Sequence, residues 1–110
     1  MELNEYQKRA LETATHDGKY KIIYPALGLG NEAGEVLGKI KKWLRGDDGA
    51  GEMAESRREA IKDELGDVLW YVATLAHDLD LKLDDVARSN VEKLKSRKER
   101  GAIKGDGDKR

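Results

Sequence analysis

The sequence of 110 residues has no cysteine, no phenylalanine and a single proline. The lack of cysteine excludes disulfides and thiolate metal sites. No apolar run approaches the roughly 18–20 residues that cross a membrane, and residues 1–8 lack the pattern of a signal peptide. We therefore expect a cytoplasmic protein that has no membrane partner.

Aromatic residues are also scarce, at 5% of the chain, whereas charged residues make up 39%. An average domain has roughly 25% charged residues. A single domain of this length and polarity buries only a thin core as a monomer. We therefore expect it to complete its core by oligomerisation.

Hydrophobic periodicity predicts helices over residues 2–17, 25–45, 54–80 and 83–100, and no strand. Gly18 and Gly101 are expected to end the first and last helices, and Pro25 suits the first turn of the second. Residues 46–53 form a glycine-rich loop, and residues 102–110 form a flexible basic tail. The sequence thus predicts one all-α, four-helix domain over residues 1–101.

The net charge of −1 is unevenly distributed, because residues 88–110 carry nine basic and four acidic side chains. A basic segment beside an acidic body suits a polyanion such as a nucleic acid or a phosphate chain. A solvated C-terminal segment explains the same pattern. Composition alone leaves both interpretations open.

Two pairs of acidic residues, Glu32/Glu35 and Glu64/Asp67, interrupt the apolar stripes of the second and third helices. Pairs three residues apart share one helix face. A carboxylate in such a stripe requires a compensating cation or donor, because its desolvation is costly. Two such helices facing each other would surround one cavity with four negative charges, which indicates a metal site.

Carboxylate-only ligation favours a hard cation, Mg²⁺ or Mn²⁺. Neither His16 nor His77 follows a glutamate at a spacing of three, which argues against a di-iron bundle. Both are interpreted as surface or partly packed histidines.

Polar residues on the fourth helix can serve a phosphate ligand, because Asn90, Lys93 and Arg97 share one face. Lys39, one turn after Glu35, can reach a phosphate or pair with that carboxylate. The second helix also holds four glycines, which indicate close helix packing, room for a ligand, or both: Gly28, Gly30, Gly34 and Gly38.

Together these motifs resemble the MazG-type nucleoside triphosphate pyrophosphohydrolases, within the all-α NTP pyrophosphatase superfamily. The similar segments are GLGNEAGEV at 28–36, DELGDVLWYV at 63–72 and NVEKLKSRKERG at 90–101. They contain the family's Glu-x-x-Glu, Glu-x-x-Asp and Asn-x-x-Lys-x-x-x-Arg patterns. The matching residues are Glu32, Glu35, Glu64, Asp67, Asn90, Lys93 and Arg97.

The resemblance implies hydrolysis of nucleoside triphosphates, NTP or dNTP, between the α- and β-phosphates, giving a monophosphate and pyrophosphate. It implies that the four acids bind Mg²⁺, that Lys93 and Arg97 contact phosphates, and that Asn90 lies nearby. A water would attack the α-phosphorus, and one glutamate would accept its proton. Members are homodimers, or tetramers made from dimers, with sites at subunit contacts, and many clean the nucleotide pool.

The chain departs from the expected pattern at the start of its fourth helix, Lys82-Leu83-Asp84, which has no Ser or Thr cap. The alternative function is a non-enzymatic helical module that binds nucleic acid or protein and uses the acids as structural ion pairs. No basic residue stands at helical spacing within the apolar stripes to pair with Glu32 or Glu64. This argues against the module and against a nucleic-acid partner.

Overall fold

The computed structural model describes residues 1–15 and 18–110, and within them it forms four α-helices and no strand. The all-α prediction is therefore confirmed. The helices are α1 (Leu3–Leu11), α2 (Ile23–Leu44), α3 (Glu55–Asp78) and α4 (Leu83–Glu99), and a short 3₁₀ turn, η1 (Gly18–Tyr20), precedes α2.

The first helix ends at Leu11, so the prediction that it reaches residue 17 and stops at Gly18 is wrong. Trp70 of α3 provides the reason, because its indole Nε1 donates to the Ala10 carbonyl at 3.1 Å and to Thr13 Oγ1 at 2.9 Å. The Thr13 hydroxyl also donates to the Ala10 carbonyl, at 2.9 Å. These donors satisfy a carbonyl that would otherwise continue the helix. Residues 16 and 17, and so His16, lie outside the described residues.

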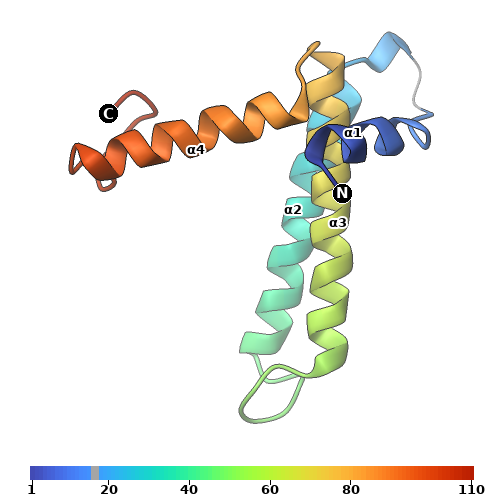
Figure 1. Ribbon diagram of the computed structural model, residues 1–110. Coiled ribbons are helices and arrows are strands. Elements are labelled where there is room, and N and C mark those ends of the chain that lie inside the picture. Colours follow the sequence, from blue (N-terminus) through green and yellow to red (C-terminus); the bar gives the residue numbers. More distant parts are fainter. Residues whose placement is uncertain (16–17) are drawn as a thin grey trace.

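Helices α2 and α3 form a long antiparallel hairpin, α1 crosses its open end, and α4 leaves that end sideways as an arm (Figure 1). Close packing in the hairpin depends on Gly28, because a Cβ at this position would lie 2.2 Å from Tyr71 Cε1. The Tyr71 ring also lies 6.3 Å from the Tyr24 ring and 5.0 Å, edge to face, from the Trp70 ring. Among the described residues, no atom of another element would lie within 4 Å of a Cβ at Gly30, Gly34 or Gly38, so close packing accounts for Gly28 and not for these three.

Three helices end in Schellman motifs, in which the chain turns through a left-handed residue just after the helix. The left-handed residues are Gly46, Asp80 and Gly101, with φ of 93°, 58° and 68°. The hydrogen bonds from Ala102 N to Arg97 O and from Gly101 N to Lys98 O complete the last motif. The prediction that Gly101 ends the fourth helix is therefore confirmed.

The missing cap of α4 is supplied by α1. The Gln7 side chain accepts from Leu83 N at 3.0 Å, and Asn4 Oδ1 accepts from Asp84 N at 2.9 Å. Gln7 Nε2 in turn donates to the carbonyls of Ala73 and Leu81, at 3.2 and 3.0 Å. The bonds to Leu83 N and Asp84 N satisfy amides that have no partner within α4. Helix α1 therefore fixes the direction in which α4 leaves the hairpin.

The core is thin. The buried hydrophobic residues are Ala10, Ala73, Ala76 and Leu83, and many large apolar side chains are exposed. The radius of gyration is 17.0 Å, whereas a compact chain of this length has about 13 Å. No described helix combines the length and the hydrophobicity of a membrane span.

We predict that Gly28→Ala destabilises the hairpin by about 1–3 kcal/mol, because the added methyl displaces the Tyr71 ring. Gly34→Ala is the matched control on the same helix, where open space surrounds the new methyl. It should be neutral or stabilise by up to about 1 kcal/mol through helix propensity. Chemical denaturation measures both, and equal stability of the two variants would contradict the packing role of Gly28.

Candidate functional site

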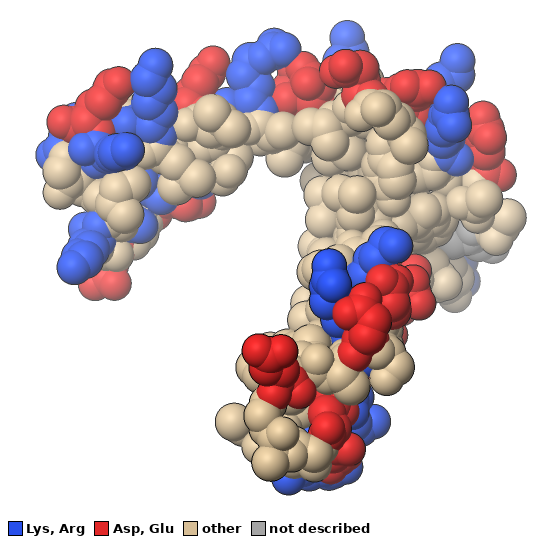
Figure 2. All heavy atoms as spheres, turned by 60° about the horizontal axis from the view of Figure 1, so that its bottom comes forward, with Lys and Arg blue, Asp and Glu red and all other residues tan. Residues whose placement is uncertain are grey.

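Three carboxylates from the two hairpin helices converge on one point. Glu32 lies on α2, Glu64 and Asp67 lie three residues apart on α3, and one oxygen of each fits within 4.8 Å of the others. Figure 2 shows acidic atoms gathered on the hairpin beside basic ones. The facing helices therefore bring together three of the four acids singled out from the sequence.

The fourth acid, Glu35, is exposed and lies outside this group. It remains near enough for its charge to contribute to the raised pKa of Glu32. Its role as a metal ligand stays a prediction.

Glu64 is the most constrained member of the acidic cluster formed by Glu32, Glu64 and Asp67. Only 17% of its side chain is exposed, and its Oε2 atom is buried without a hydrogen-bond partner among the described residues. Its other oxygen, Oε1, lies 3.7 Å from Lys39 Nζ of α2. A buried acceptor without a partner is costly, so the protein alone leaves the cluster incompletely satisfied.

The crowding of negative charge raises the pKa of Glu32. The largest cause is the hydrogen bond that a protonated Glu32 can make to Glu64, followed by burial and by the charges of Glu64, Asp67 and Glu35. The same field extends to Tyr71, whose pKa is raised first by burial, then by its hydrogen bond with Tyr24, and then by charges that include Glu32 and Asp67. The site therefore favours positive charge.

A divalent cation fits this donor set. The cluster offers only carboxylate oxygens, which are ligands that Mg²⁺ and Mn²⁺ prefer. Glu64 Oε2 has no hydrogen-bond partner within residues 1–15 and 18–110, so it offers a ligand atom, and Lys39 supplies one positive charge against three carboxylates. Glu32, Glu64 and Asp67 are thus the residues that would hold such an ion.

The Lys39–Glu64 pair does not follow from the sequence. Lys39 was expected to reach Glu35 or a phosphate, whereas it crosses from α2 to pair with Glu64 of α3. Glu64 therefore has a basic partner, although none stands within the apolar stripes. The pair is visible only in the structure, where α2 and α3 bring the two side chains together.

The candidate phosphate-binding residues of α4 lie far from the acidic cluster in space. Asn90 and Lys93 border an open groove of about 410 Å³ on α4, and Arg97 lies one turn beyond Lys93. At 1.5 Å per residue, Arg97 is roughly 21 Å along the arm from Leu83, while Asp67 is roughly 18 Å down α3 from Leu79. Because the arm diverges from the hairpin (Figure 1), one chain does not bring these groups to the acidic cluster.

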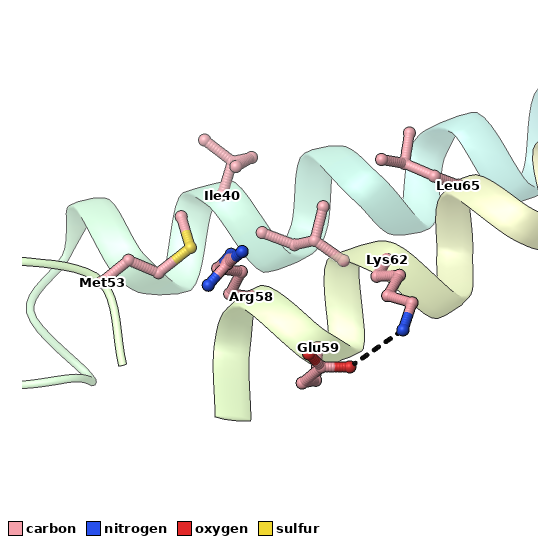
Figure 3. A pocket seen from close by; sticks show the side chains of 7 residues that line it. Ile40, Met53, Arg58, Glu59, Lys62 and Leu65 are labelled. Atoms are coloured by element: carbon pink, nitrogen blue, oxygen red, sulfur yellow. Dashed lines mark ion pairs between the residues drawn. The ribbon is translucent and has the colours of Figure 1, made fainter. Parts of the chain in front are cut away.

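A second open groove, of about 430 Å³, lies between α2 and the first half of α3, next to Met53 of the connecting loop (Figure 3). It includes the neighbours of Lys39 and Glu64 in the chain, Ile40 and Leu65. The Glu59–Lys62 ion pair, with oxygen and nitrogen 3.6 Å apart, lies at its edge. Apolar side chains of both hairpin helices are thus accessible in this groove.

Comparison with known proteins identifies the class to which this fold and site belong. Residues 25–101 match the family model of the MazG nucleotide pyrophosphohydrolase domain. The chain belongs to this family, and the matched range contains the candidate site residues Glu32, Glu35, Lys39, Glu64, Asp67, Asn90, Lys93 and Arg97.

The chain is also similar to the Gene 37 protein of Mycobacterium phage L5. The two are 43% identical over 116 aligned positions, which cover the whole length of both chains. No solved structure matches the chain.

In the metal-free protein, we predict that Glu32 makes stability fall as pH rises. Its folded pKa lies above its ordinary value of 4.5, so the folded state retains a proton that the unfolded state releases. Its stabilising contribution is complete below pH 4.5 and is lost as pH rises through the raised folded pKa. Melting temperatures in EDTA, measured from this pH to neutrality, should show the decline.

Glu32→Gln should flatten this decline, because the variant has no carboxyl group to titrate. The matched control is Glu52→Gln, which changes an exposed glutamate in the α2–α3 loop and should keep the wild-type slope. A wild-type slope in Glu32→Gln would contradict the electrostatic description of the cluster.

Proposed function

We propose that the protein hydrolyses nucleoside triphosphates, NTP or dNTP, between the α- and β-phosphates, with Mg²⁺ as its cofactor. The products are a nucleoside monophosphate and pyrophosphate, and the proposed role is housekeeping of the nucleotide pool in the cytoplasm. Family membership supports the reaction class. The observation that carries the metal requirement is the buried, unpartnered Glu64 oxygen within a cluster of three carboxylates.

Each group of residues has a distinct part in this proposal. Glu32, Glu64 and Asp67, with Glu35 at the margin, hold Mg²⁺, which when bound supplies charge neutralisation and water activation. A water attacks the α-phosphorus, one glutamate of the cluster accepts its proton, and pyrophosphate leaves. Glu32 and Glu64 are the two glutamates of the cluster available for this step.

Phosphate binding requires positive groups, and the arm carries them. Lys93 and Arg97 are the proposed phosphate donors, with Asn90 beside them. Lys39 already lies at the cluster, so it can contact a phosphate there once a metal ion takes over its pairing with Glu64.

Because the arm diverges from its own hairpin, we propose that it serves the acidic cluster of a second copy. The extended shape and the thin core support a homodimer, or a tetramer made from two dimers. Uncharged surface covers much of the hairpin near the base of the arm (Figure 2). Exposed apolar side chains of the hairpin, including Leu37, Ile40 and Leu65, are available for the contact with that copy.

The alternative, a binding module with structural ion pairs, is supported by one observation, the Lys39–Glu64 pair. A single lysine does not balance three carboxylates, and in the described part of the chain Glu64 Oε2 has no partner. Full pairing would be expected if the acids served only to stabilise the fold. The geometry therefore favours the enzyme.

We predict that Glu64→Gln lowers pyrophosphate release by several orders of magnitude, because it removes a metal ligand without changing the shape of the side chain. Asp63→Asn is the matched control, since Asp63 is exposed and adjacent in sequence. Turnover is measured with each NTP and dNTP plus Mg²⁺, which also identifies the preferred base. A fully active Glu64→Gln protein would contradict the assignment.

Arg97→Ala should weaken nucleotide binding or lower kcat, while stabilisation by Mg²⁺ survives. Mixing this variant with Glu64→Gln tests whether the arm acts in a second copy. In a mixed dimer one of the two sites combines an intact cluster with an intact arm. Equal mixing makes about half of the dimers mixed, so it should restore about a quarter of wild-type turnover. No recovery after subunit exchange would show that each chain supplies its own arm.

A further inference from the structure

The C-terminal tail, residues 102–110, folds back onto the tip of the arm (Figure 1). The left-handed Gly101 reverses the chain after α4, and Gly107, with φ of 81°, allows a second turn. Arg110 holds the turn together by donating to the carbonyls of Ala102, Ile103 and Gly107, at 3.1, 2.9 and 2.6 Å. The prediction that the tail is flexible is not tested by these contacts, but they define where it docks.

The docked tail brings one carboxylate to both proposed phosphate donors. Asp108 Oδ1 lies 3.1 Å from Lys93 Nζ and 3.4 Å from an Arg97 terminal nitrogen. The same Arg97 nitrogen donates to the backbone carbonyls of Asp108 and Gly107. The pKa of Asp108 is lowered, first by Lys93 and then by Arg97, so this carboxylate is charged at neutral pH.

The tail covers Arg97 without satisfying it. Only 5% of the Arg97 side chain is exposed, and its Nε is buried with no hydrogen-bond partner among the described residues. A guanidinium offers five donors in a planar fork that matches the oxygens of a phosphate. Asp108 and the tail carbonyls engage one terminal nitrogen of this fork.

We propose that the tail is an autoinhibitory segment, in which Asp108 takes the position of a phosphate oxygen on Lys93 and Arg97 and competes with polyphosphate ligands. This inference rests on the phosphate-binding role assigned to the arm under the proposed function. Pyrophosphate carries several charges and many acceptor oxygens, so it can satisfy both cations, including the unused Nε of Arg97.

The competition is modest in strength. The Asp108 side chain is 83% exposed, and ion pairs in contact with water are weak. The tail therefore lowers the affinity for phosphate ligands without closing the site, and removal of the Asp108 charge should raise that affinity by about two- to tenfold.

The test uses the full chain and inorganic pyrophosphate, without metal, so that the basic arm is the site probed. Calorimetry compares wild type with Asp108→Asn and with Asp106→Asn, a matched control in the same tail. Asp108→Asn should bind pyrophosphate about two- to tenfold more tightly, and Asp106→Asn should bind as wild type does. Adding Arg97→Ala to Asp108→Asn should abolish the gain.

A second measurement reports the position of the tail. In the wild type, pyrophosphate should accelerate tryptic cleavage after Lys104, because displacement releases the tail from the arm. Any of three results would overturn the proposal. They are equal pyrophosphate affinity of the three proteins, weaker binding by Asp108→Asn, and cleavage that pyrophosphate does not change.

Nucleotide turnover of the same proteins separates this inference from the proposed function. Equal pyrophosphate affinities together with active turnover would reject the tail competition and retain the enzyme. A gain in affinity for Asp108→Asn, with no turnover of any nucleotide by any of the proteins, would reject the enzyme and retain the competition.

Discussion

Three carboxylates on the α2–α3 hairpin, those of Glu32, Glu64 and Asp67, repel one another at close range. Their oxygens lie within 4.8 Å of one another, and Lys39 offsets only part of their charge. The packing of Gly28 on Tyr71 holds the two helices close enough for this crowding. In the metal-free protein a proton on Glu32 relieves part of this repulsion, and the proposed Mg²⁺ would relieve it more fully.

The second constraint is the separation of opposite charges. Gln7 and Asn4 of α1 cap α4 and so direct the arm away from the hairpin, which keeps Lys93 and Arg97 remote from the acids of their own chain. The acids therefore do not pair with these cations within one chain. The cations pair with Asp108 of the tail instead, at the end of the arm.

Helices α2, α3 and α4 were predicted to within two residues at each end, because their apolar stripes are long and regular. The convergence of Glu32 with Glu64 and Asp67 also followed from the sequence, since a charge within a stripe must face a neighbouring helix. The early end of α1 did not, because it depends on a hydrogen bond from Trp70, 60 residues away. The sequence did not reveal the pair of Lys39 with Glu64, or the pairs of Asp108 with Lys93 and Arg97. Each joins two segments that only the fold brings together.

The metal site is tested by the melting temperature of EDTA-treated protein with and without millimolar Mg²⁺, for wild type and Glu64→Gln. Mg²⁺ should raise the melting temperature of the wild type by binding the folded state. Glu64→Gln should melt higher than wild type in EDTA, because repulsion is relieved, and it should lose the response to Mg²⁺. A wild-type melting temperature unchanged by Mg²⁺ would contradict the proposed metal site.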